Sequence, residues 1–249
     1  PLPTETRVST VSNQKGGVGK TTTTVNLASA LARRGANVLV IDLDPQGNAS
    51  TALGVPHRPE VTSVYDVLLG DSSLEEALQT SSDHENLLCV PSTINLAGAE
   101  IELVSLVARE QRLRTALHTF LQESEREYHY VFIDCPPSLG LLTVNALFAA
   151  DRVLIVAEPA AWSLDGVEQI LRNVRRIADR QDGRPEVAGI VVNRLGRTRD
   201  AGYWYDQLRE THGDRIVGAM STTRKRDVPA VESCRYCGGG LLTSVFDTS

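Results

Sequence analysis

A glycine-rich segment near the N-terminus carries the residues whose types and spacing indicate the clearest chemistry. The segment reads Gln14-Lys15-Gly16-Gly17-Val18-Gly19-Lys20-Thr21-Thr22. Glycines let a backbone curl so that its N–H groups point inward at phosphate oxygens, and a helix that begins at Lys20 adds the positive end of its dipole. Lys20 is then expected to reach the β- and γ-phosphates, and the Thr21 hydroxyl to ligate Mg²⁺. The segment is therefore predicted to bind a nucleoside triphosphate.

Carboxylates follow two apolar segments that are predicted to be strands. Asp42 and Asp44 come at the end of the first of them, and Asp134 ends the second. In open parallel sheets, ligands bind in the crevice beside the carboxyl ends of the strands. Asp134 is placed as an acid that holds Mg²⁺ through water, and Asp42 is expected to lie near the same ion. An ordinary turn at a strand end remains the alternative for each of these acids.

The glycine-rich segment departs from the usual phosphate-binding loop in an informative way. The usual loop has glycine five residues before Gly19, whereas this chain has Gln14 there, followed by a second lysine, Lys15. With DLDPQGN at 42–48 and DCPPS at 134–138, this deviant pattern resembles the ParA/MinD branch of P-loop ATPases.

The resemblance implies roles for three of these side chains. Lys15 would reach across a dimer interface to the phosphates of the partner's ATP, and would stabilise the transition state together with Lys20. Asp44 would orient or activate the attacking water. The resemblance thus implies an Mg²⁺-dependent ATPase with ATP as its nucleotide, a weak basal rate, and an ATP-dependent homodimer.

The resemblance also suggests where the adenine base and DNA would bind. Asn193 would contact adenine, although an asparagine at a strand end is often only a turn residue. Non-specific duplex DNA needs only positive charge against its phosphates. The candidate DNA-binding residues are Arg172, Arg175, Arg176, Arg197, Arg199 and Arg226. A solvated helix face is the alternative for the arginines that recur at helical spacing.

These residues must be positioned by alternating strands and helices. Strands are expected over 7–12, 37–42, 86–90, 130–134, 152–157, 187–193 and 215–219. Helices are expected over 20–33, 96–127 with a break near Ala108, 139–149, 166–180 and 201–212, with two short helices over 61–79. The predicted fold is a doubly wound α/β fold of the P-loop NTPase class, with a mostly parallel sheet, helices on both faces, and a single domain over 1–249.

Composition excludes several classes of protein. The 249 residues are 41% hydrophobic and 22% charged, which argues against a disordered tail, a fibre or a membrane bundle. A formal net charge of −6 argues against a uniformly basic nucleic-acid coat. Charge is segregated, because residues 60–127 hold 13 acids and 4 bases while residues 172–199 hold 8 bases and 3 acids. Four cysteines and no secretory leader favour the cytoplasm, and the resemblance to the ParA/MinD branch implies association with the nucleoid.

The leading interpretation is a DNA-segregation ATPase whose ATP-bound dimer binds DNA, and whose hydrolysis is stimulated by a ParB-like centromere-binding partner. A MinD-like membrane-positioning ATPase, a regulator on the same ATPase fold, and an electron carrier of the nitrogenase-reductase kind are alternatives. No stable membrane association is expected, because the tail at 241–247 lacks a basic amphipathic face. The resemblance weakens after about residue 220, where a single Cys-x-x-Cys pair, Cys234 and Cys237, is insufficient for a zinc site.

Overall fold

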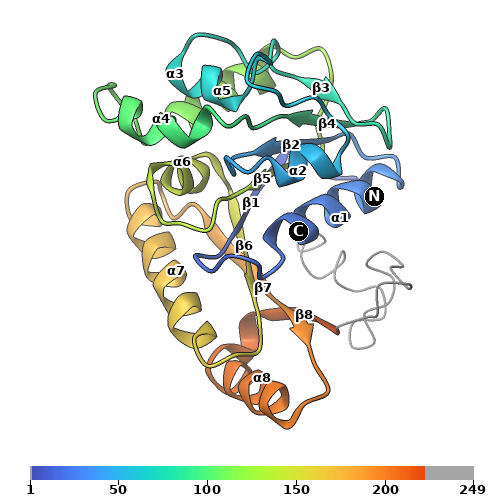
Figure 1. Ribbon diagram of the computed structural model, residues 1–249, viewed down its shortest axis with the longest axis vertical. Helices are drawn as coiled ribbons and strands as arrows, with labels where there is room; N and C mark the ends of the chain where they lie inside the picture. The colour runs from blue at the N-terminus through green and yellow to red at the C-terminus, as the bar shows by residue number, and fades with distance from the viewer. Residues whose placement is uncertain (1, 222–249) are drawn as a thin grey trace.

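The computed structural model describes residues 2–221 of the chain, and within them eight strands form one sheet (Figure 1). The strand order is β3-β4-β2-β5-β1-β6-β7-β8. Neighbouring strands run parallel except for the antiparallel edge pair β3–β4. The strands are β1 Arg7–Ser12, β2 Val38–Asp42, β3 Gln79–Thr80, β4 Leu87–Val90, β5 Tyr130–Asp134, β6 Arg152–Ala157, β7 Glu186–Leu195 and β8 Ile216–Ser221.

Helices cover both faces of this sheet. They are α1 Lys20–Ala32, α2 Asn48–Ala52, α3 Val64–Leu69, α4 Leu96–Leu103, α5 Arg112–Glu123, α6 Leu141–Ala149, α7 Ser163–Ala178 and α8 Arg199–His212. Helices α1 and α2 pack on one face, where Val40 and Phe132 point. Helices α3 to α8 pack on the other, against Ile41, Ile133 and Ile155. Because successive strand side chains point to opposite faces, a strand buried on both sides is almost wholly apolar, as β2 and β5 are.

The prediction of a doubly wound, mostly parallel α/β fold is confirmed, as is the expected break near Ala108, and one predicted short helix is absent. Residues 96–127 form α4 and α5, and the chain turns between them where Ala108 has a φ of 52°. The prediction of two short helices over 61–79 is wrong in its second half. Only α3 forms there, and the chain turns through 74–77 before Gln79 pairs with Cys89 in the sheet edge. Tertiary strand pairing overrides local helical preference in that segment.

The sheet brings the candidate chemistry to its carboxyl edge. Strands β2, β5 and β1 are neighbours in its centre, and Asp42 stands directly opposite Asp134 in the register. The glycine-rich loop leaves the carboxyl end of β1, which pairs with β5 on one side and β6 on the other. Among residues 2–221, no helix is long and apolar enough to cross a membrane.

Candidate nucleotide-binding site

The loop between β1 and α1 has the backbone shape that its glycines predict. Gly17 and Gly19 have φ values of 76° and 97°, in the region that favours glycine, and α1 begins immediately after Gly19. A Cβ on Gly19 would lie 2.1 Å from Asn193 Nδ2, so the loop also needs glycine there for lack of space. The helix N-terminus and the loop N–H groups therefore form the kind of site that binds anionic phosphates.

Lys20 lies inside this loop with its charge turned toward the loop backbone. Its side chain is buried, and Nζ donates a hydrogen bond to the carbonyl oxygen of Lys15 at 3.1 Å. Burial lowers the pKa of Lys20 from its ordinary value, and the nearby Asp134, Cys135 and Asp44 oppose that shift. An anion bound in the loop would favour the charged amine.

Asp134 and Thr21 form the candidate magnesium site. Thr21 Oγ1 donates to Asp134 Oδ2 at 2.6 Å, and Thr24 Oγ1 donates to Oδ1 at 3.1 Å. Burial, and then the neighbouring Asp42, raise the pKa of Asp134 to about 7. A hydroxyl beside a buried carboxylate is an oxygen donor set that suits Mg²⁺. In the described part of the chain no group of three or more His, Cys, Asp or Glu side chains could hold a metal, so such an ion would rely on phosphate oxygens and water as well.

Asp42 and Asp44 play different parts in the segment that follows β2. Asp42 is fully buried, and its carboxylate accepts hydrogen bonds from Ser50 N at 2.8 Å, Ser50 Oγ at 2.7 Å and Asp44 N at 3.1 Å. Burial raises the pKa of Asp42 to about 6. Asp44 Oδ1 accepts from Gln46 N at 3.0 Å. Asp42 thus holds the segment in shape, and Asp44 is near enough to Lys20 for its charge to act on the pKa of that lysine.

Lys15 has a partner that sequence reasoning missed. Its Nζ lies 3.1 Å from Glu158 Oε2, and the other oxygen of the same carboxylate lies 2.8 Å from Arg194 Nη1. Glu158 follows β6 directly at the carboxyl edge of the sheet, which is the signal that could have found it. In this structure the second lysine of the loop is paired within its own chain.

Asn193 lies against the phosphate-binding loop. Its Nδ2 donates to the carbonyl oxygen of Val18 at 2.8 Å, and its Oδ1 accepts from Arg194 N at 2.8 Å. Arg194 itself has a φ of 55°, an uncommon value for a residue with a side chain. The Asn193 side chain therefore fixes the phosphate-binding loop to β7. The contact of Asn193 with adenine stays a prediction.

Of the candidate DNA-binding arginines, Arg172 lines a pocket together with Gln14 and Lys15 of the loop. Arg172, Arg175 and Arg176 are exposed on α7, and Arg197 and Arg199 are exposed at the start of α8. Arg172 pairs with Glu168 at 3.3 Å. Arg226, Cys234 and Cys237 lie outside the described residues.

Cys135 shows no sign of redox chemistry and is a buried thiol beside Thr10. Thr10 Oγ1 and Cys135 Sγ are 2.9 Å apart, and burial raises the Cys135 pKa to about 12. Because the thiolate is the reactive form, burial and the raised pKa disfavour reaction of this cysteine at neutral pH. Its environment is that of a small buried thiol.

The parallel sheet, the glycine-rich loop that opens α1 and the carboxylate that ends β5 define a P-loop nucleoside triphosphatase. The AAA domain family matches residues 6–186. The chain is 43% identical over 196 residues to the sporulation initiation inhibitor protein Soj of Bacillus subtilis, covering 79% of this chain and 76% of that protein. It is 40% identical over 215 residues to the chromosome partitioning protein ParA of Caulobacter vibrioides, covering 86% and 79%. The chain therefore belongs to the AAA domain family, and within it to the ParA/Soj-type chromosome-partitioning ATPases.

Solved structures agree with this fold. A cobyrinic acid a,c-diamide synthase from Mycobacterium smegmatis, with a bound ATP analogue and magnesium, superposes with a TM-score of 0.82 at 34% identity, covering 95% of this chain and 94% of that one. A putative plasmid partition protein from Borrelia burgdorferi, bound to AMPPNP, gives a TM-score of 0.78 at 20% identity, covering 98% and 100%. The second similarity is one of fold alone.

Proposed function

We propose that this chain is an Mg²⁺-dependent ATPase whose ATP-bound homodimer binds duplex DNA without sequence preference, and that a ParB-like partner stimulates hydrolysis and release on the nucleoid. The observation that carries the proposal is the loop itself, in which a buried Lys20 and the Thr21–Asp134 pair lie beside Asp44. Membership of the ParA/Soj-type ATPases supports it.

In this proposal the loop binds the triphosphate through its N–H groups, and Lys20 neutralises the β- and γ-phosphates. Thr21 and Asp134 would hold Mg²⁺, which supplies positive charge to the same phosphates. Asp44 accepts a hydrogen bond from the attacking water and aligns it with the γ-phosphate. The magnesium-bound structure of the Mycobacterium smegmatis protein supports a metal ion in a site of this fold.

Lys15 makes the activity depend on dimerisation. It is the loop lysine that reaches outward, with 46% of its side chain exposed, and its carboxylate partner Glu158 is shared with Arg194. In an ATP-bound dimer Lys15 would leave Glu158 for the partner's phosphates and add positive charge in the transition state. ATP would thereby favour the dimer, and hydrolysis would remove that preference.

A gel-shift assay with duplex DNA tests the proposal. It compares the chain without nucleotide, with ADP and with ATP, and uses the Asp44→Ala variant to keep ATP from being hydrolysed. We expect a shift only with ATP, on any sequence, with slowed hydrolysis by the variant. Asp71→Ala, which removes an exposed acid of another surface, is the matched control and should hydrolyse ATP normally. Undiminished hydrolysis by Asp44→Ala would overturn its water-orienting role, and an ATP-bound variant that never shifts DNA would overturn the DNA-binding role.

A second candidate function has one specific observation in its favour, the 34% identity to a protein named as a cobyrinic acid a,c-diamide synthase. Such an enzyme would use ATP to activate a carboxylate for amidation. ATP consumption that rises with added cobyrinic acid and ammonia, and is unchanged by DNA, would favour this function. Stimulation by DNA together with a centromere-binding protein would favour partitioning.

A further inference from the structure

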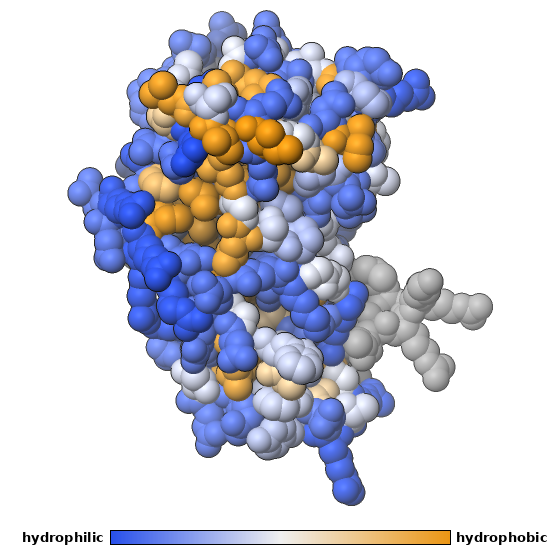
Figure 2. Space-filling model, turned by 60° about the vertical axis from the view of Figure 1, so that its left-hand side comes forward, coloured by the Kyte–Doolittle hydropathy of each residue, from blue (hydrophilic) through white to orange (hydrophobic). Residues whose placement is uncertain are grey.

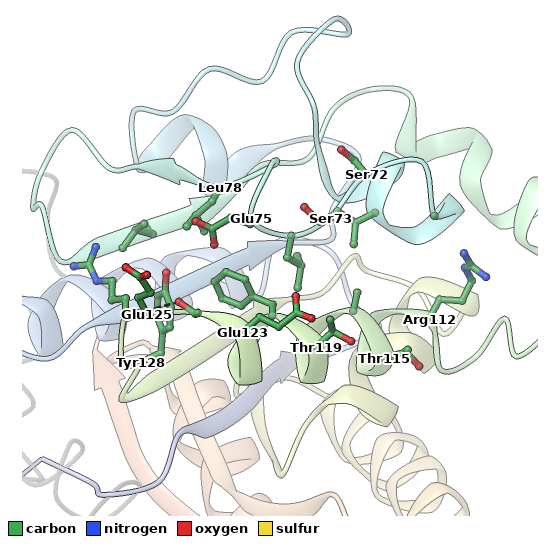
Figure 3. Close-up of a pocket in the computed structure, with 18 of the residues that line it drawn as sticks. Ser72, Ser73, Glu75, Leu78, Arg112, Thr115, Thr119, Glu123, Glu125 and Tyr128 are labelled. Atoms are coloured by element: carbon green, nitrogen blue, oxygen red, sulfur yellow. Dashed lines mark hydrogen bonds between the residues drawn. The ribbon is translucent and has the colours of Figure 1, made fainter.

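A cavity of about 930 Å³ lies between α5 and the segment 70–78, outside the nucleotide site (Figure 3). Thr115, Thr119 and Glu123 line it from α5, and Ser73 and Glu75 face them from the other wall. None of the loop, Asp44 or Asp134 takes part in it. Any ligand of this cavity would therefore bind separately from the nucleotide.

One end of this groove is fixed by Arg112. The guanidinium donates hydrogen bonds to the carbonyl oxygens of Leu68 and Leu69, the latter at 2.9 Å. These are carbonyls of the last turn of α3, which a helix cannot satisfy by itself. A Cβ on Gly70 would lie 2.6 Å from Arg112 Nη2, so glycine permits the close approach. The two walls are thereby joined, and the groove is preformed.

The floor of the groove is apolar, and an exposed aliphatic side chain lies near its Arg112 end. Leu74, Leu88 and Phe120 form the floor, with the Phe120 and Tyr128 rings 5.3 Å apart. At the Arg112 end, Val107 is 88% exposed. Ile101 and Val104, a few residues before Val107, are exposed as well. Figure 2 shows apolar residues gathered on the upper half of the molecule. Exposed aliphatic side chains that adjoin a groove are typical of a protein-binding surface.

The opposite end of the groove is acidic. Glu75, Glu123 and Glu125 line it and are exposed, and within the described part of the chain they form no ion pair. Glu76 differs, because its carboxylate accepts hydrogen bonds from Ser72 and Ser73.

Arg126 also lines this end of the groove, with its guanidinium carbon 6.0 Å from the centre of the Tyr128 ring, but it forms no ion pair with the three glutamates. The Arg126 guanidinium is turned to Asn37 and to the Glu85 carbonyl oxygen. Like charges gathered at one end of a groove repel one another, and a cationic ligand would relieve that repulsion.

We propose that this groove docks a basic amphipathic segment of a protein partner. Its apolar side chains would lie along the floor toward Val107, and its lysines or arginines would lie against Glu75, Glu123 and Glu125. A groove alongside the twelve residues of α5 is about 18 Å long, the length of a short helix or strand. Apolar and acidic recognition at opposite ends requires a ligand that spans this length, which favours a peptide segment over a small cation.

Fluorescence anisotropy with labelled synthetic peptides tests the proposal on the full, nucleotide-free chain. The probes are peptides as long as α5, with leucines at helical or alternating spacing in one half and lysines in the other. A matched set has glutamates in place of the lysines. We expect saturable binding of at least one leucine–lysine peptide and no binding of its glutamate counterpart. Failure of every leucine–lysine peptide to bind would overturn the proposal.

Variants test whether the peptide lies in the groove. Combined Glu75→Gln, Glu123→Gln and Glu125→Gln should weaken binding by about tenfold, because three exposed ion pairs are lost. The same charge change on α8, by Asp200→Asn, Asp206→Asn and Glu210→Gln, should weaken it less than about twofold. Equal loss in both triple variants would overturn the proposal in favour of non-specific charge attraction.

Thr119→Trp tests the groove by shape alone. Thr119 is exposed on the wall, so a tryptophan there fills the groove without disturbing the core, whereas His118→Trp adds the same bulk on α5 outside the groove lining. We expect Thr119→Trp to abolish peptide binding and His118→Trp to leave it intact. Unaltered binding of the peptide to the Thr119→Trp variant would overturn the proposal. Displacement of the peptide by spermine, added at the same total concentration of positive charge as the peptide, would overturn it as well.

The proposal stands apart from nucleotide binding and is measured separately from it. Lys20→Ala should leave peptide affinity unchanged, because Lys20 does not line the groove. If ATPase or DNA binding fails its test while the peptide still binds in this pattern, the docking site stands and the proposed function falls.

Discussion

Opposite charges are buried close together at the phosphate-binding loop, and each carries a cost of desolvation. Burial lowers the pKa of Lys20 and raises the pKa values of Asp42 and Asp134 to about 6 and 7. Buried charges are costly unless paired. A triphosphate with its metal ion would offset these costs, so the loop residues favour ligand binding at the expense of the stability of the empty protein.

Lys20→Met should separate those two effects. Methionine keeps the apolar stem but removes the charge, so we expect ATP affinity to fall by about 30- to 100-fold. The free energy of unfolding of the nucleotide-free protein should stay equal or rise by about 1 kcal/mol, because a buried charge is removed. Calorimetric titration and urea unfolding measure the two quantities. Arg34→Met, at an exposed position after α1, should change neither, and tight ATP binding by Lys20→Met would contradict the phosphate assignment.

The Lys15–Glu158 pair also admits a direct measurement. We expect a double-mutant cycle of Lys15→Met and Glu158→Gln to give a coupling free energy of about 0.5 kcal/mol, since the pair is partly exposed and screened by water. Urea unfolding of the four proteins in low salt provides the data. A coupling of zero would show that Lys15 is not held by Glu158 in solution.

At the scale of elements, helix α8 ends in a buried titratable group. The His212 ring is only 5% exposed, and burial, then Arg215, lower its pKa from 6.5. Helix α8 joins the core through Leu208, and β8 follows it after a single 3₁₀ turn, Gly213–Arg215. The folded state of this end of the sheet therefore favours the neutral form of the His212 imidazole.

The lowered pKa predicts a pH dependence of stability. The unfolded chain binds a proton at His212 more readily than the folded chain does, so stability should be full above pH 6.5 and fall as the pH decreases below it. His212→Phe removes this dependence. Asp42 and Asp134 act in the opposite direction, but equally in both proteins.

The difference in the free energy of unfolding between the His212→Phe variant and the parent protein gives the contribution of His212 to the pH dependence of stability. Urea unfolding between pH 5 and pH 8 should show a constant difference above pH 6.5 and a growing advantage for the variant below it. A difference that does not change with pH would contradict the assignment.

At the scale of the whole molecule, charge is distributed in two regions. Residues 60–127 hold a net charge of −9 and build the faces around α3 to α5, whereas residues 172–199 hold +5 on α7 and the approach to α8. The net charge of −6 for the whole chain does not reveal this separation, because the regional charges of opposite sign partly cancel in the sum. A polyanion would be attracted to one end of the molecule, and a basic peptide to the other.

Arg175→Glu with Arg197→Glu should therefore weaken DNA binding in the ATP state and reduce the salt dependence of log K by about one unit for each lost phosphate contact. ATP affinity should not change, because neither side chain lies in the loop. Binding isotherms at several salt concentrations measure the slope. Arg33→Glu with Arg34→Glu, beyond the end of α1, is the control of equal charge, and an equal effect of the control would refute a localised DNA surface.

Features that depend on neighbours in the chain could be predicted from the amino-acid order alone. The P-loop glycines, the helix after Lys20 and the buried apolar strands follow from local backbone freedom and periodicity. The shared edge of Asp42 and Asp134 followed too, because parallel strands align their carboxyl ends. The helix expected in the second half of 61–79 failed, since its end pairs with β4 instead.

Contacts between distant segments of the chain could be identified only from the folded structure. The pairing of Lys15 with Glu158 joins residues 143 positions apart, and the bond from Asn193 to Val18 joins residues 175 positions apart. The groove beside α5 likewise depends on Arg112 reaching the end of α3 across 43 and 44 positions. Such contacts leave no local periodicity in the sequence, because they are fixed by the order of strands in the sheet and by the packing of helices over it.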